Sequence, residues 1–432
     1  MSQYSVGFAR LDMTPPMGVP LGGSWEKRSA IGVRDPLYVN AVAFGDGEKS
    51  AVLLVMDLLG IYGVRGYQWA KDLEKELQLP ENSLILCSTH THTGPSVGAD
   101  ELYDKWLYRR LRDAAQIALD DRKPLVDLRW TEDRAEGLAY VRRFKLSDGT
   151  VMTNPAGTYQ DMIVGPAGYV DDTMRVIRIL REDAKEIVIT NFQAHPDNIG
   201  GCYVSADYPG AFRNHMEQQL GNAHCVFLDG CEGQMVISQR KPGQPKTPAS
   251  HEKATRYGIK LAEKALSLVE KTVSTEATGL SFGELAVDLK TKRDSSRVPE
   301  SQRIIELYDS GRWEEVASTK KQANYLSAEA RKIVALERSG EDYRPTAVCA
   351  IAFCGMALVG IPGEPFNEVG VQIRGNSKSP ATCCMCQANG CHGYYPTAEA
   401  YDQGGYESYN TPYVKGTAEQ LADTADRLVA TL

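Results

Sequence analysis

Two of the seven histidines in this sequence lie two positions apart, directly after an apolar segment that is typical of a buried strand. The segment 83–87 reads Ser-Leu-Ile-Leu-Cys, and His90 and His92 follow it among threonines. In an extended chain, side chains two positions apart point to the same side, so both imidazoles would face one site beyond the strand. Neutral imidazole is a good zinc ligand, and the pattern therefore predicts a metal site. The alternative is a pair of loop histidines that are hydrogen-bonded to the neighbouring threonines.

Polar side chains also follow other apolar segments of the chain. They are Asp57 after 51–56, His195 after 186–193, Asp229 after 226–228 and Glu364 after 356–361. Each of them alone is more often a helix cap or a turn residue than a ligand. Open α/β sheets bind ligands beyond the carboxyl ends of their strands, so these groups would converge on one crevice if the strands share a sheet. Together with the histidine pair, they favour a metal site.

The elements that must position these residues alternate along the chain. Short apolar runs rich in Val, Ile and Leu suit strands that are buried on both faces. Apolar residues recur at helical spacing over 67–77, 103–119 and 254–269. This alternation predicts an α/β fold with a mixed, mainly parallel sheet core covered by helices, built as one domain over 1–432.

Two segments depart from this alternation. Residues 299–343 are charged and follow a helical pattern, which predicts a helical insertion within the domain. Residues 240–248 contain Pro242, Pro245 and Pro248, which defeat regular backbone pairing and predict a loop.

Composition limits the partners and the setting. The chain has 432 residues and a net charge of -8, which argues against nucleic acid as a partner, because phosphate binding needs clustered Lys and Arg. No run of about 18 apolar residues occurs, so we expect no stable membrane insertion. The N-terminal residues lack the basic and apolar regions of a secretory signal, and ten cysteines without such a signal favour free thiols. We therefore expect a cytoplasmic protein, and the sequence leaves its oligomeric state open.

Several motifs occur in the order that is found in one enzyme family. They are Val-Gly-Phe-Ala-Arg-Leu-Asp-Met-Thr-Pro-Pro at 6–16, Asp-Pro-Leu-Tyr-Val at 35–39, Thr-His-Thr-His-Thr-Gly-Pro at 89–95, Ala-His at 194–195, Pro-Gly-Glu at 362–364 and Asn-Gly-Cys-His-Gly-Tyr-Tyr-Pro-Thr at 389–397. Over nearly its whole length, the chain resembles the catalytic domain of the neutral/alkaline ceramidases, zinc enzymes that hydrolyse the amide bond of ceramide.

The resemblance implies roles for individual residues. It implies a zinc ion held by His90, His195, Glu364 and Tyr394. It also implies that His92 faces the catalytic water, either to orient it or to protonate the leaving group.

Two further residues are candidate helpers at the substrate carbonyl. The family places an arginine near its substrate, in an element similar to 140–144, where this chain has Arg142. Two adjacent arginines, as at 142 and 143, are more often a surface pair. Tyr406 belongs to the continuation of the tyrosine motif and is the second candidate.

Three departures from the family pattern bear on the substrate. Val236 occupies the position that aligns with a family serine near the metal, and neither an immunoglobulin-like C-terminal domain nor a secretion signal is recognisable. We therefore expect a zinc-dependent hydrolase of an acyl bond, preferably an amide, that acts on a smaller or more soluble small molecule than ceramide. The alternatives are an ester or lactone hydrolase and a binding protein that retains the metal site without turnover.

The cysteines at 383, 384, 386 and 391 form one crowded group. Zinc sites built from cysteines usually need two regularly spaced pairs, which this group lacks. Buried thiols on a strand are therefore the favoured interpretation, and a second metal site is the alternative.

Overall fold

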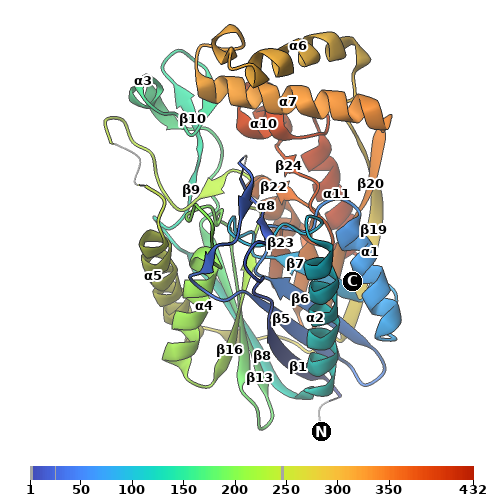
Figure 1. The fold of residues 1–432 in the computed structure, drawn as a ribbon. Helices are drawn as coiled ribbons and strands as arrows, with labels where there is room; N and C mark the ends of the chain where they lie inside the picture. Colours follow the sequence, from blue (N-terminus) through green and yellow to red (C-terminus); the bar gives the residue numbers. More distant parts are fainter. Residues whose placement is uncertain (1–2, 25, 245–247) are drawn as a thin grey trace.

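Two β-sheets form the centre of the protein in the computed structural model, which describes residues 3–24, 26–244 and 248–432 (Figure 1). The nine-stranded sheet runs in the order β16 (Ala223–Asp229), β14 (Glu186–Phe192), β13 (Thr173–Arg181), β8 (Lys123–Arg134), β1 (Ser5–Asp12), β5 (Tyr38–Gly45), β6 (Ser50–Met56) and β7 (Leu84–Ser88), with β18 (Val273–Ser274) also paired to β8. The four-stranded sheet runs in the order β19 (Leu280–Lys290), β20 (Tyr343–Phe353), β21 (Met356–Gly360) and β23 (Ala381–Met385).

Alternate side chains of the same strand enter different cores. Leu53 and Val55 of β6 pack between the two sheets, together with Ile351 and Leu358 of the four-stranded sheet. The intervening side chains of β6 pack on the opposite face, against α2 (Glu101–Asp120). Because both faces are buried, the strand reads as a continuous apolar run rather than as an alternating one.

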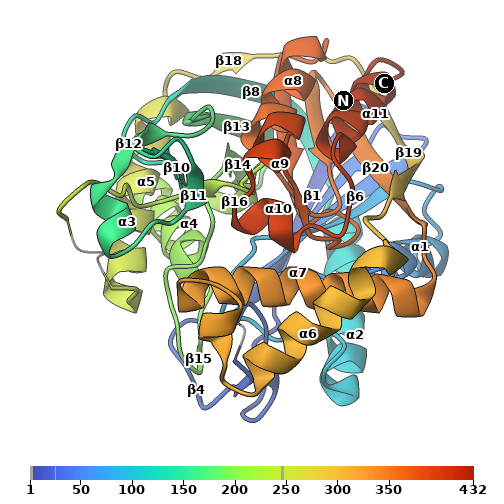
Figure 2. The same ribbon diagram turned by 90° about the horizontal axis from the view of Figure 1, so that it is seen from above.

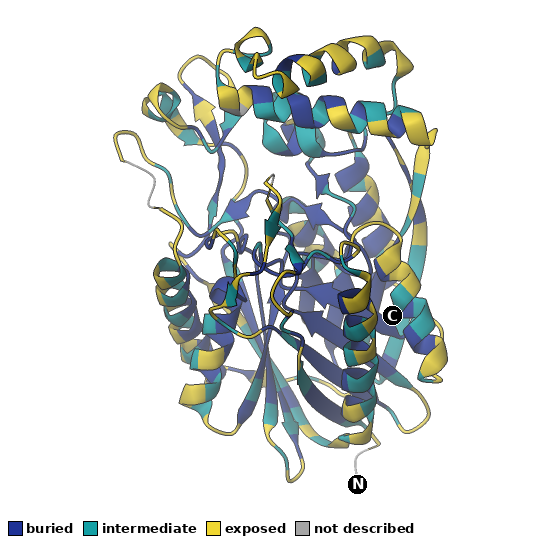
Figure 3. Ribbon diagram, viewed as in Figure 1, coloured by how far each residue is buried: buried dark blue, intermediate teal, exposed yellow. Residues whose placement is uncertain are grey.

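Helices cover the outer faces of both sheets and complete a helix–sheet–sheet–helix sandwich (Figures 1 and 3). One half of the nine-stranded sheet lies under α1 (Arg65–Glu76) and α2, and the other half lies under α4 (Asp207–Leu220) and α5 (His251–Val269). The four-stranded sheet is covered by α8 (Asn367–Asn376) and α11 (Thr417–Val429). Side chains cap two of these helices: Asp100 accepts a hydrogen bond from Tyr103 N, and Ser250 accepts one from Lys253 N.

The mixed α/β class is confirmed, but the expectation of a mainly parallel sheet is wrong. Within the nine-stranded sheet, only β14–β16 and β6–β7 pair in parallel, and the other neighbouring strands are antiparallel. Consecutive strands such as β5 and β6 are joined by a short turn, which requires the antiparallel direction. A strand that is buried on both faces is apolar throughout, whether its neighbours are parallel or antiparallel. Here the second sheet buries the face that a helical layer covers in a parallel α/β sheet.

A helical hairpin lies beyond the carboxyl ends of the central strands (Figures 1 and 2). It consists of α6 (Val298–Asp309) and α7 (Lys320–Ser339), within the region where the sequence predicts a helical insertion. Residues 240–244 and 248 lie outside helices and strands, as the prolines predict, and the remainder of that loop, 245–247, lies outside the described residues. None of the helices in the described ranges is both long enough and apolar enough to span a membrane.

The remaining elements are short and lie mostly around the carboxyl ends of the central strands. They are β2 (Pro20–Leu21), β3 (Arg28–Ser29), β4 (Gly32–Val33), β9 (Tyr140–Val141), β10 (Arg143–Leu146), β11 (Val151–Thr153), β12 (Ile163–Pro166), β15 (Tyr203–Val204), β17 (Met235–Val236), β22 (Glu364–Pro365), β24 (Tyr394–Tyr395), α3 (Thr158–Asp161), α9 (Ala398–Gln403), α10 (Tyr406–Asn410) and the 3₁₀ turns Ser295–Arg297 and Trp313–Glu315.

Candidate metal centre

The segments that follow four strands of the two sheets meet at one buried point. His90 follows β7, His195 follows β14, Glu232 follows β16, and Glu364 follows β21. The nine-stranded sheet curves enough that its end strands, β7 and β16, contact each other. This curvature brings together residues that lie far apart both in sequence and in strand order.

The side chains of these four residues point toward one another. Glu364 Oε2 lies 3.2 Å from His195 Nε2 and 3.6 Å from His90 Nε2. Glu232 Oε1 lies 3.9 Å from His90 Nε2. One potential ligand atom from each of the four lies within 4.8 Å of every other, and His92 forms a similar group with the other two histidines. We call these five residues the strand-end cluster.

Backbone carbonyls fix the orientation of all three imidazoles in the cluster. His90 Nδ1 lies 2.7 Å from Leu59 O, His92 Nδ1 lies 2.9 Å from Gly23 O, and His195 Nδ1 lies 3.1 Å from Glu232 O. A carbonyl oxygen only accepts hydrogen bonds, so each Nδ1 carries a proton, and in the neutral form of each imidazole Nε2 presents its lone pair. This is the arrangement in which metal-bound histidines are held.

The donor set fits a metal ion. Glu364 Oε2 and both carboxylate oxygens of Glu232 are buried and accept no hydrogen bond from the described residues. The Nε2 atoms of His90 and His92 lie 3.4 Å apart, so they share a proton when His90 is protonated and both face the cluster with lone pairs when the two rings are neutral. A buried acceptor without a donor is costly, and a cation among these atoms would satisfy them together.

The imidazoles and carboxylates of the cluster shift one another's pKa values. Burial alone would lower the pKa of His90, but Glu364 and Glu232 outweigh it and raise this pKa to about 9, so a metal that binds here would displace a proton. Burial, assisted by the charge of Arg142, lowers the pKa of His195 to about 4, so the imidazole is neutral at pH 7. Burial alone would raise the pKa of Glu364, but His90 and His195 outweigh it and hold this pKa well below its ordinary value. Burial raises the pKa of Glu232 to about 7, so this carboxyl is easily protonated.

Tyr394 and Arg142 lie against one side of the cluster. The Tyr394 hydroxyl lies 3.4 Å from His195 Nε2. The Arg142 guanidinium carbon lies 5.4 Å from the ring centre of Tyr394 and 5.6 Å from that of Tyr406. The structure therefore places Tyr394, Arg142 and Tyr406, three of the predicted site residues, next to one another beside the histidines.

Arg142 and Arg143 are not a surface pair, because both side chains are buried. Arg142 Nε donates to Glu407 Oε1 at 2.7 Å, and Arg143 Nη1 lies 3.3 Å from Glu407 Oε2. Burial alone would raise the pKa of Glu407, but the two arginines outweigh it and lower this pKa. One carboxylate thus holds both guanidinium groups, and its position immediately after Tyr406 is the only sequence signal for this role.

His92 is more exposed than the other histidines of the cluster. Its side chain keeps 15% exposure, against 2% for His90 and 1% for His195. His90 and His92 face one site, but not through an extended chain, because His90 has a left-handed backbone with φ of 65°. This conformation is uncommon for residues other than glycine, although histidine adopts it more often than most.

The other strand-end carboxylates have different surroundings. Asp57 accepts two hydrogen bonds from Arg213, at 3.0 and 3.2 Å, and takes no part in the strand-end cluster. Asp229 lies behind the cluster, where it forms a second potential ligand group with Glu232 and Cys386. Sequence reasoning missed Glu232 as a site residue, although its place just after an apolar strand is the signal that singled out the others.

Of the cysteines at 383, 384, 386 and 391, Cys386 alone belongs to a group of potential metal ligands among the described residues. Cys383 and Cys384 lie on β23 as buried free thiols, as predicted. Their strand packs in the sheet core, where each thiol serves as a small apolar group.

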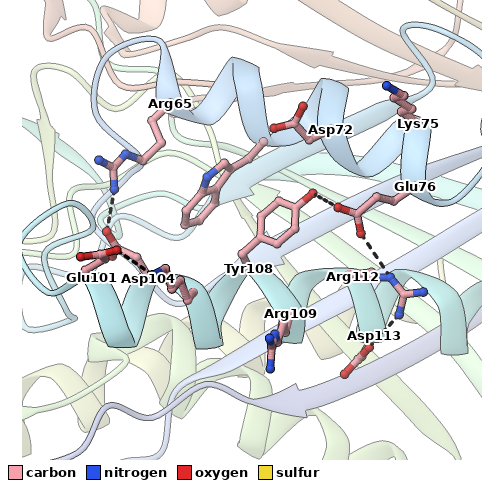
Figure 4. A pocket seen from close by; sticks show the side chains of 12 residues that line it. Arg65, Asp72, Lys75, Glu76, Glu101, Asp104, Tyr108, Arg109, Arg112 and Asp113 are labelled. Atoms are coloured by element: carbon pink, nitrogen blue, oxygen red, sulfur yellow. Dashed lines mark hydrogen bonds and ion pairs between the residues drawn. The ribbon is translucent and has the colours of Figure 1, made fainter.

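An open pocket lies away from the strand-end cluster, between α1 and α2 (Figure 4), and we call it the α1–α2 groove. Its volume is about 1080 Å³. Its lining side chains are largely charged, and many of them pair with each other: Arg65 with Asp104 at 2.6 Å and Arg112 with Glu76 at 3.3 Å. None of the predicted site residues lines it.

Comparison with known proteins gives a structural match without a sequence match. No protein-family model matches the chain, and no curated protein matches it by sequence. The neutral ceramidase of Pseudomonas aeruginosa superposes with a TM-score of 0.72 at 15% identity, over 99% of this chain and 74% of the ceramidase chain. A ceramidase complexed with C2 gives the same TM-score at 16% identity, over 99% of this chain and 75% of its own. The chain therefore has the neutral ceramidase fold, as its motifs predict.

Proposed function

We propose that the protein is a zinc-dependent hydrolase that cleaves an acyl bond, preferably an amide. The observation that carries this proposal is the strand-end cluster, in which backbone carbonyls orient three imidazoles and the ionised carboxylate of Glu364 lies at the same buried point. Such geometry suits a metal centre that keeps room for a substrate. The fold shared with the neutral ceramidases supports a hydrolytic reaction.

His90, His195, Glu364 and Tyr394 are the proposed ligands. Nitrogen and oxygen donors of this kind, with histidine predominating, are typical of zinc. When bound, zinc would polarise the substrate carbonyl and lower the pKa of a water molecule. The Glu232 carboxylate lies 3.9 Å from His90 Nε2, and the Glu232 backbone carbonyl orients His195.

His92 is the proposed general base and acid. Its Nδ1 proton is held by Gly23 O, so its Nε2 lone pair faces the cluster and can take a proton from water. The same nitrogen can then return the proton to the leaving group. Such proton transfer is worth about 10²–10⁴-fold in rate.

Arg142 supplies fixed positive charge next to the reacting carbonyl. Glu407 and Gly233 O hold its guanidinium in place, and it lies over the rings of Tyr394 and Tyr406. A preorganised cation of this kind stabilises negative charge that develops on an oxygen. Tyr406, whose ring lies 5.5 Å from that of Tyr394, closes the same side of the site.

A metal analysis coupled to hydrolysis of a panel of N-acyl, ester and lactone substrates tests this function. We expect one zinc per chain and turnover of an N-acyl compound that disappears with the metal. Turnover of esters or lactones alone would favour the alternative hydrolase. Stoichiometric zinc without turnover of any acyl compound would favour a binding protein and contradict the proposal.

The substrate in this proposal is smaller or more soluble than ceramide, and we place its reaction in the cytoplasm. Val236, at the position of the family serine, lines a cavity next to His195 that is lined mostly by polar residues. We expect a higher kcat/KM for water-soluble N-acyl compounds than for long-chain ceramide in detergent. A tenfold advantage for ceramide, about 1.4 kcal/mol in transition-state binding, would contradict this part of the proposal.

A further inference from the structure

A small cavity adjoins the strand-end cluster on the side of His195. It has a volume of about 150 Å³, and His195, Arg142 and Val236 form part of its wall. Since one water molecule occupies about 30 Å³ in the liquid, the cavity holds roughly five waters or a group of that size. The cavity therefore suits a compact polar substituent rather than an alkyl chain.

Arg240 brings a cation to this cavity without a carboxylate beside it. Its Nε donates to Asn154 Oδ1 at 3.1 Å, and its Nη1 donates to Pro155 O at 2.8 Å, so neutral acceptors position the guanidinium. No carboxylate of residues 3–24, 26–244 and 248–432 lies within 4.0 Å of it. Arg142, in the same cavity, is instead paired with Glu407 at 2.7 Å.

A second cation and a helix end add to the positive potential. Lys253 lies in the first turn of α5 and lines the cavity, as does Ala249, just before the capping residue Ser250. The N-terminus of a helix carries a partial positive charge. Among the described residues that line the cavity, the only acidic one is Asp197, which lies 3.7 Å from His92 Nδ1.

Resting on the proposed hydrolase function, we propose that the acyl substrate carries an anionic group, a carboxylate or a phosphate, that binds to Arg240 and Lys253. The cavity lies beside His195. When the anionic group of a small substrate binds in this cavity, the acyl bond of the same molecule can therefore reach the strand-end cluster. A guanidinium binds either anion through paired hydrogen bonds, and a site that is built for a charge rejects the neutral analogue. Ceramide has no such group.

Two matched substrate pairs test this inference. The first pair is an N-acetyl amino acid and its carboxamide, and the second is N-acetylethanolamine phosphate and N-acetylethanolamine. With the zinc-loaded protein, we expect kcat/KM to favour the anionic member of at least one pair by roughly tenfold or more, which is about 1.4 kcal/mol. The pair with the larger preference identifies the anion.

Variants of Arg240 and Lys253 test whether these two residues cause the preference for the anionic substrate. We expect Arg240→Gln to bring the ratio of the two kcat/KM values close to one, mainly through KM, and Lys253→Gln to reduce it. Arg240→Lys keeps the charge and should restore part of the preference. Lys241→Gln is the matched control, because Lys241 is exposed and does not line the cavity. Melting temperatures of all variants check that they fold.

Calorimetric binding of the anionic compounds separates this inference from the proposed function. Binding that depends on Arg240 but is followed by no turnover would contradict the hydrolase and keep the anion site. If the protein hydrolyses both members of each pair with equal kcat/KM, and Arg240→Gln leaves these values unchanged, the anion site is overturned and the hydrolase function is kept. Absence of both binding and turnover would contradict both.

Discussion

The α1–α2 groove and the strand-end cluster are both rich in titratable side chains, but many of these side chains are paired with each other in the groove, whereas those of the cluster converge on one buried point. The groove is open, and its charges pair across it, as in the 2.6 Å contact between Arg65 and Asp104 (Figure 4). The cluster is buried, and several of its acceptors, among them Glu364 Oε2, have no hydrogen-bond donor among the described residues. The groove has about 1080 Å³ of space, against about 150 Å³ beside the cluster.

This difference shows that the volume of a pocket does not identify the candidate reactive site in this molecule. Paired charges in water interact weakly and leave no requirement for a ligand. Buried lone pairs that converge carry a free-energy cost that a cation would relieve, and in a low-dielectric site they act strongly on a substrate. Substitutions in the two regions should therefore have very different effects.

The largest effect is expected from the proposed zinc ligands. His195→Ala and Glu364→Ala should each remove most of the zinc and lower kcat/KM by roughly 10³-fold or more, because the metal stabilises transition-state charge by several kcal/mol. Metal content by mass spectrometry and steady-state kinetics measure both effects. Arg65→Ala in the groove is the control and should change neither the zinc content nor kcat/KM. Full zinc content in a double variant, His195→Ala with Glu364→Ala, would show that the cluster is not the metal centre.

Removal of the metal should also destabilise the protein. A ligand that binds only the folded state stabilises it by about 2.7 kcal/mol at a hundredfold excess over its Kd. Treatment with dipicolinate should therefore lower the melting temperature in calorimetry, and added zinc should restore it. An unchanged melting temperature would mean that the buried carboxylates and imidazoles are satisfied without a cation.

A smaller effect is expected for His92. The variant His92→Ala should keep stoichiometric zinc, because this side chain is proposed to act on water rather than on the metal, and should lose about 10²-fold or more of kcat. Zinc analysis beside kinetics distinguishes the two roles. Loss of zinc from this variant would make His92 a ligand and shift the proposed ligand set toward the three histidines.

Two variants test stability alone and compare one ion pair from each region. Glu407→Gln should lower the free energy of unfolding by roughly 3–5 kcal/mol, because it leaves buried Arg142 and Arg143 without a counter-charge. Glu76→Gln in the groove should cost no more than about 1 kcal/mol, since Glu76 and Arg112 are exposed. Urea unfolding of both variants measures the difference, and equal losses would contradict the comparison.

The contribution of Glu407 should also depend on pH in a defined direction. Its folded-state pKa lies below the ordinary value of 4.5, so the unfolded chain takes up a proton first as the pH falls. The gap in unfolding free energy between the parent protein and Glu407→Gln should therefore be complete above pH 4.5 and shrink below it. A gap that widens in acid would show that Glu407 is protonated in the folded protein.

The sequence by itself determined the elements and most of the residues of the candidate site. The apolar runs that predict strands at 51–56 and 186–193 match β6 and β14 closely, since burial on both faces leaves a local signal. His90, His195 and Glu364 stood out because a polar side chain after such a run is visible without any tertiary information. The motifs around them were sufficient to predict the fold at an identity of 15%.

Only the tertiary structure decided how these residues meet. Strand direction depends on which strands are neighbours, and the curvature that brings β7 to β16 depends on the packing of two sheets against each other. The burial of Arg142 depends on Glu407, 265 positions away, and no local pattern encodes such a pair. Glu232 joins the cluster for the same reason. Local chemistry marks the side chains that can act, whereas long-range packing determines which of them share a site.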